Sequence, residues 1–189
     1  TEGDVESFCA NVYAVSQLST RSLVEEYTTT TTATTSTASE ELIDEWKMAL
    51  MDPYEVPEHT PIYWYLGVRA CQLFCQEYRR YPGMTDTDAD TDTADDWESD
   101  VPLLASHAKK ALEQYSLSEE AASYMPNILK ELTRYANAEI HTVASVVGGV
   151  ASQEAVKLIT GQYIPLNNTY VFNGIVGVGG VYKFQREHD

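Results

Sequence analysis

The chain has 189 residues, of which 43% are hydrophobic and thirteen are tyrosine, and its net charge is −17. This length and composition are typical of one ordinary globular domain or of two small ones. The negative charge argues against binding to nucleic acid or to anionic membrane surfaces, because both repel acidic proteins. Eight of the 29 acidic residues lie between Asp86 and Asp100 with no basic residue among them, so much of the acidity is local.

Residues 1–135 have the pattern of a mainly helical domain. Capping residues, proline at first helical positions and apolar residues at helical spacing mark most of its elements. Residues 28–37 are almost all threonine and have nothing to bury, so a disordered insert is expected near 28–38. The predicted helices cover Ser19–Tyr27, Ser39–Leu50, Pro61–Arg80, Pro102–Tyr115, a segment from Ser118 that is broken at Pro126, and Ile128–Tyr135 capped by Asn127.

The acidic stretch at 86–96 invites comparison with a calcium-binding EF-hand loop, because its acids alternate. Counting from Asp86, the loop positions that need glycine and glutamate hold Thr91 and Trp97 instead. We therefore interpret residues near 84–100 as a second disordered insert, a solvated acidic linker.

The run from Thr142 to Thr160 is apolar on nearly every side of a helical wheel, so it predicts a helix that is buried on all sides. Gly148 and Gly149 lie in its middle, where each glycine costs about 1 kcal/mol relative to alanine. Such a pair favours the close approach of another backbone. Gly161 follows as the stop signal.

Two short strands are predicted after this helix, at Thr169–Phe172 and Val181–Gln185. The glycine-rich stretch Gly174–Gly180 between them looks at first like a nucleotide-binding loop. No helix follows it, although a dinucleotide-binding loop needs one, so a turn is the better interpretation.

No complete catalytic site is evident in the sequence. The four histidines are scattered, and none has a cysteine or a second histidine at zinc-ligand spacing. The three cysteines, Cys9, Cys71 and Cys75, are too few for a disulfide framework and are expected to be buried structural thiols in a reducing compartment. With no signal peptide and no membrane-spanning run, the expected location is cytoplasmic, nuclear or both. The chain opens without Met, which suggests a processed chain or a piece of a longer protein.

Gln153, Glu154 and Lys157 are polar residues on the otherwise apolar helix, and polar groups that become buried must be paired. A local hydrogen-bond network that holds neighbouring elements is the preferred interpretation. The residues expected to serve structure or an interface, with no catalytic, cofactor-binding or metal residue among them, are Ala144, Gly148, Gly149, Gln153, Glu154 and Lys157.

The stretch from Ala144 to Phe172, with its Gly148-Gly149 and Gln153-Glu154 pairs, resembles the inactive adenylation-type half of the activating enzymes for ubiquitin and ubiquitin-like modifiers. Arg21–Tyr27 and Arg80-Tyr-Pro-Gly83 narrow this resemblance to the regulatory subunits of neddylation-activating enzymes. It covers most of the chain except the threonine insert and the acidic linker. Phe172-Asn173 stands where the ubiquitin-activating relatives have Phe-Asp, a departure that favours a non-catalytic role.

The resemblance implies a C-terminal portion of such a subunit. Residues 1–135 would be a helical insertion, a degenerate catalytic-cysteine-type domain. Residues 136–189 would supply the closing helix and two strands of an α/β Rossmann-like, ThiF-like adenylation fold. The implied partners are a catalytic subunit, which would bind ATP and Mg²⁺, and a ubiquitin-like modifier. The alternatives are the inactive half of a single-chain ubiquitin-activating enzyme, which a reading frame continuing past Asp189 would support, and a stand-alone helical interaction module.

Overall fold

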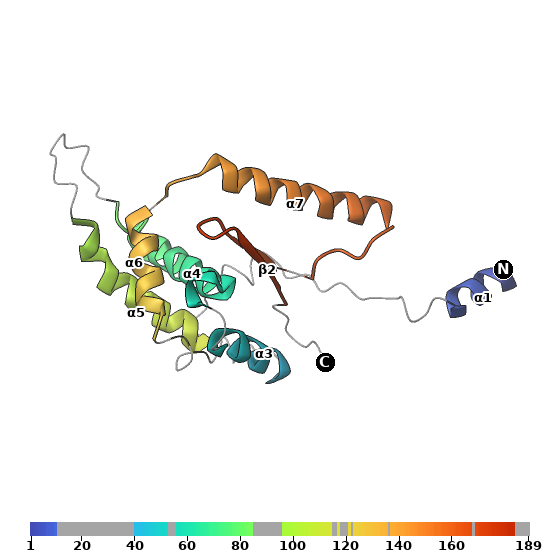
Figure 1. Cartoon of the computed structure of the whole chain (residues 1–189), viewed down its shortest axis with the longest axis horizontal. Coiled ribbons are helices and arrows are strands. Elements are labelled where there is room, and N and C mark those ends of the chain that lie inside the picture. The colour runs from blue at the N-terminus through green and yellow to red at the C-terminus, as the bar shows by residue number, and fades with distance from the viewer. Residues whose placement is uncertain are drawn as a thin grey trace.

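The computed structural model describes residues 1–10, 40–52, 56–84, 96–114, 117, 121, 123–135, 137–167 and 169–183. These residues form a mainly helical structure with one antiparallel pair of strands (Figure 1). Mainly α with a small β part was the class predicted from the sequence, and it is confirmed. The elements are α1 (Glu2–Ala10), α3 (Glu40–Met51), η2 (Pro57–His59), α4 (Pro61–Tyr78), η3 (Asp96–Asp100), α5 (Val101–Gln114), α6 (Met125–Tyr135), α7 (His141–Thr160), β1 (Thr169–Asn173) and β2 (Val178–Tyr182).

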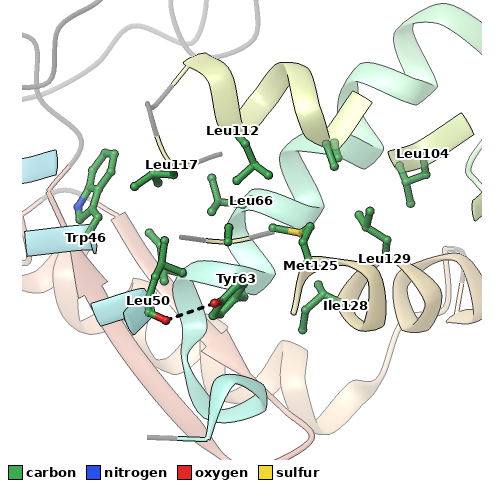
Figure 2. Close-up of a cluster of buried hydrophobic side chains, with 14 of the residues drawn as sticks. Trp46, Leu50, Tyr63, Leu66, Leu104, Leu112, Leu117, Met125, Ile128 and Leu129 are labelled. Atoms are coloured by element: carbon green, nitrogen blue, oxygen red, sulfur yellow. Dashed lines mark hydrogen bonds between the residues drawn. The ribbon is translucent and has the colours of Figure 1, made fainter. Parts of the chain in front are cut away.

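Helix α4 is the centre of the bundle and contacts α3, α5, α6 and both strands. It starts with Pro61, whose missing N–H costs nothing in the first turn of a helix. Its side chains Ile62, Leu66 and Phe74 are fully buried. Figure 2 shows Leu66 among buried side chains of the neighbouring helices, and the Tyr63 hydroxyl donates a hydrogen bond to the Leu50 carbonyl at 3.3 Å. The rest of the core includes Trp46, Leu104, Ala108, Leu112, Leu117, Ala121, Met125, Ile128 and Leu129.

The predicted helices at 39–50, 61–80 and 102–115 are present, but the start of α6 differs from expectation. The sequence placed its cap at Asn127, whereas α6 begins at Met125 and takes Pro126 into its first turn. Proline fits there because the first helical N–H groups have no partner inside the helix. The predicted helix at 19–27 and the threonine insert lie outside the described residues.

The expectation of disorder throughout 84–100 was wrong at its C-terminal end. Residues 96–100 form η3, which contacts α5 and α6. Asp100 is only 5% exposed, and its carboxylate accepts hydrogen bonds from Arg80 and from the Gly83 amide, as a buried charge requires. Residues 85–95, with most of the suspected calcium loop, lie outside the described residues.

Strands β1 and β2 form a hairpin in which Tyr170 pairs with Val181 and Phe172 pairs with Gly179. The second strand begins at Val178, three residues earlier than predicted, because Gly179 and Gly180 lie in the strand and only Gly174–Gly177 form the turn. The Tyr170 ring covers Gly179 so closely that a Cβ there would collide with it. Aromatic cover of this kind compensates a strand glycine for its missing side chain.

Candidate interaction surface

Helix α7 is the predicted central helix, and it runs from His141 to Thr160 with Gly161 as its left-handed C-cap. It lies apart from the helical bundle, next to the hairpin (Figure 1). The expectation that it is buried on all sides is wrong within this chain, because none of its residues is buried. Leu158 is 62% exposed and Ile159 is 84% exposed. The helix is as apolar as the sequence indicates, but the described residues of this chain do not cover it.

One side of α7 does face the rest of the chain. Four of its residues are half-buried, namely Val143, Val150, Glu154 and Lys157. Their spacing of seven, four and three residues puts them on one side of a helix with 3.6 residues per turn, which we call the inner face. Near its start, Val143 lies against the hairpin turn, since a Cβ at Gly174 would collide with the Val143 side chain.

The opposite side of α7, which we call the outer face, is exposed and built largely of small residues. Its two serine hydroxyls need no hydrogen-bond acceptor from a partner protein, because each donates to the backbone carbonyl four residues earlier. Ser145 bonds to His141 and Ser152 to Gly148, both at 2.8 Å. The outer face consists of Ala144, Ser145, Gly148, Gly149, Ala151, Ser152, Ala155 and Ile159, all exposed.

The surface of α7 beside Gly148 and Gly149 is not covered by any described residue. No heavy atom lies within 4 Å of a Cβ added at Gly148 or Gly149, apart from the helix's own backbone. Two mid-helix glycines lower helix stability, so their presence calls for a close neighbour. The described part of the chain contains no such neighbour.

Glu154 connects α7 to the residues that follow it. Its Oε1 accepts a hydrogen bond from Lys157 Nζ at 2.6 Å, and its Oε2 accepts one from the Leu166 backbone amide at 2.6 Å. The bond from Lys157, followed by the bond from Leu166, lowers the pKa of the Glu154 carboxyl below its usual value. The carboxylate is therefore the form that holds Leu166.

Of the residues predicted to serve an interface, Glu154 and Lys157 are brought together, as the expected hydrogen-bond network requires. Ala144, Gly148, Gly149 and Gln153 are exposed, and within the described ranges no side-chain hydrogen bond joins them to another element. Sequence reasoning missed Val143, Leu166 and Gly174. No local pattern marks Leu166 as the partner of Glu154, because a backbone amide can come from any residue.

The described residues contain no group of three or more His, Cys, Asp or Glu side chains able to hold a metal ion. Among the same residues, no helix is both long enough and apolar enough to cross a bilayer. Cys9 is exposed on α1, contrary to expectation, whereas Cys71 and Cys75 are half-buried on α4.

Comparison with models of protein families finds no match. Among individual proteins, the NEDD8-activating enzyme E1 regulatory subunit of Xenopus laevis is 33% identical over 183 residues, which are 97% of this chain and 30% of the relative. The chain belongs to the family of NEDD8-activating enzyme E1 regulatory subunits. The member of this family from Danio rerio is 30% identical over the same shares of both chains. The resemblance drawn from Ala144–Phe172 and Arg80–Gly83 is thus confirmed, and the chain spans 30% of the length of these relatives.

A more distant relative lies outside the NEDD8-activating enzyme regulatory subunits. The SUMO-activating enzyme subunit 1 of Dictyostelium discoideum is 31% identical over 87 residues, which are 46% of this chain and 26% of that protein. The similarity therefore extends to a subunit of a second activating enzyme.

Proposed function

We propose that the chain is the C-terminal portion of a non-catalytic regulatory subunit in a heterodimeric activating enzyme for a ubiquitin-like modifier. Its relatives carry the names of regulatory subunits of the NEDD8-activating enzyme. In this proposal the partner is the catalytic subunit. That subunit binds ATP and Mg²⁺, adenylates the modifier and forms the thioester.

The observation that supports a scaffolding role is the exposure of α7. A 20-residue helix rich in valine and alanine with no buried residue is a large apolar surface that a soluble protein rarely leaves uncovered. In this proposal α7 and the β1–β2 hairpin complete a Rossmann-like, ThiF-like adenylation fold, and the outer face then lies against the catalytic subunit. The proposed location is the cytoplasm, the nucleus or both.

The two alternatives make different predictions. The inactive half of a single-chain ubiquitin-activating enzyme would be joined covalently to an active half. A stand-alone helical module would fold and remain monomeric without any partner, which the exposed Leu158 and Ile159 disfavour.

The test is assembly with the catalytic subunit after substitution at Gly149. Gly149→Leu puts a large side chain where the described part of the chain leaves open space, so the fold is retained. We expect weakened co-purification with the catalytic subunit. Gly3→Leu is the matched control, because Gly3 also lies in an exposed helix and its nearest added contact is 4.0 Å away. Undiminished co-purification of the Gly149→Leu variant would contradict the proposal.

A further inference from the structure

The outer face can serve as a docking surface only if α7 is held in one direction. Two contacts hold its inner face, one from Val143 to the hairpin turn at Gly174 and one from Glu154 to Leu166. Val143 and Glu154 are eleven residues apart, which is about 16 Å along a helix at 1.5 Å per residue. Two anchors at this separation are enough to fix the direction of the helix axis against the hairpin turn at one end and against Leu166, which precedes the hairpin, at the other.

The two anchors differ in kind. The contact at Val143 is apolar and tolerates sliding, whereas the hydrogen bond at Glu154 has a defined length and direction. Leu166 belongs to residues 161–167, which we call the return segment because they lead from Gly161 back to β1. The residues just before Leu166 hold this segment weakly, because Ile164 is 65% exposed and Pro165 has no N–H to donate. The Leu166 amide therefore supplies a hydrogen bond that fixes the segment against α7.

We propose that Glu154 is a positioning residue for the docking surface: its carboxylate fixes α7 against the return segment and so sets the direction of the outer face. This rests on the proposed function, because the outer face must have a partner for its direction to matter. Lys157 has a secondary part in this arrangement. It neutralises the second carboxylate oxygen but makes no bond of its own to the return segment.

Three variants of the polypeptide distinguish the positioning role of the Glu154 hydrogen bond from an effect of the Glu154 charge. Glu154→Ala removes the acceptor for Leu166, and we expect the affinity for the catalytic subunit to fall about tenfold, as for loss of a charge-assisted hydrogen bond. Glu154→Gln retains an oxygen that can accept from Leu166, so its affinity should stay within about threefold of wild type. Lys157→Met leaves the Glu154–Leu166 bond in place and should behave like Glu154→Gln.

Amide hydrogen exchange supplies a second readout that does not depend on the partner. The Leu166 amide should lose protection in Glu154→Ala and keep it in Glu154→Gln and Lys157→Met, while the amides of α4 are unchanged. A loss of binding caused by general unfolding would instead remove protection from α4.

Two results would overturn the positioning role. One is wild-type affinity in Glu154→Ala. The other is a Glu154→Gln variant that binds the catalytic subunit as poorly as Glu154→Ala, which would indicate that the charge of Glu154, and not its hydrogen bond to Leu166, supports binding. If wild-type polypeptide fails to bind the catalytic subunit, the proposed function itself is contradicted, and the exchange of Leu166 still reports whether Glu154 holds the return segment.

Discussion

The carboxylate of Asp100 receives both arms of the Arg80 guanidinium, so the last residue of η3 is tied to the turn that follows α4. Nη2 lies 2.7 Å from Oδ1, Nη1 bonds to Oδ2, and the Gly83 amide donates to Oδ2 at 2.7 Å. Arg80 also donates to the Met84 carbonyl at 2.9 Å, and its guanidinium lies 5.2 Å from the centre of the Phe74 ring. One buried carboxylate thus organises the turn Arg80–Gly83.

Replacement of Asp100 by asparagine should destabilise the helical bundle strongly. The substitution keeps the size of the side chain but leaves the Arg80 charge without its counter-ion, and loss of one partner of a buried pair costs about 3 kcal/mol. Urea denaturation followed by circular dichroism measures the change. Glu98→Gln is the control, because Glu98 pairs with Lys130 at 3.5 Å on the surface and its loss should cost less than about 1 kcal/mol. Equal losses in the two variants would contradict the role assigned to Asp100.

The same pair predicts how stability changes in acid. The hydrogen bond from Arg80 is the largest cause that lowers the pKa of Asp100, and the Gly83 amide adds to it against the opposing effect of burial. A folded-state pKa below the unfolded value means that the stabilisation is fully present above the ordinary pKa of about 3.9 and is lost as the pH falls through the folded value. The stability difference between wild type and Asp100→Asn should therefore be constant from about pH 5 to 7 and shrink below about pH 4. A difference that shrinks towards neutral pH would be inconsistent with this sign.

The sequence predicted the helices of the bundle well because they are defined by local signals. These signals are proline at the start of α4 and apolar residues at helical spacing. Each involves residues that are close in the sequence, so it can be recognised without a structure. The start of α6 was misjudged because proline is read as a helix breaker, although the first turn accepts it.

The environment of α7 was the part that sequence patterns could not supply. An apolar pattern shows that a helix needs cover, but not whether the cover comes from its own chain. In the same way, the acidity of residues 84–100 concealed the structural role of Asp100, because its partner Arg80 lies twenty positions away. Interactions over that distance follow from the fold alone.

The cysteines should differ sharply in their reactivity. Burial, with a smaller contribution from Cys75, raises the pKa of the Cys71 thiol to about 12. Because the thiolate is the reactive form, Cys71 should be alkylated on the order of a thousandfold more slowly at pH 8 than an ordinary exposed thiol. Mass spectrometry after timed treatment with iodoacetamide should find Cys9 modified first, since it is exposed. Labelling of Cys71 at the same rate as Cys9 in the folded chain would contradict the burial of α4.

Gly83→Ala should be among the most damaging single-methyl substitutions in the chain. Gly83 has a φ of +81°, and a Cβ there would collide with the backbone carbonyl of Thr133, a fully buried residue of α6 that has no room to move. Gly177 is the matched control, because its φ is +73° but no atom lies within 4 Å of an added Cβ. Gly177→Ala should cost about 1 kcal/mol for the left-handed backbone alone. Gly83→Ala adds overpacking and should cost about 3 kcal/mol or more. The midpoints of urea denaturation measure both changes. Equal shifts in the two variants would mean that the turn is not packed against α6, and that Arg80-Tyr-Pro-Gly83 does not join α4 to α6.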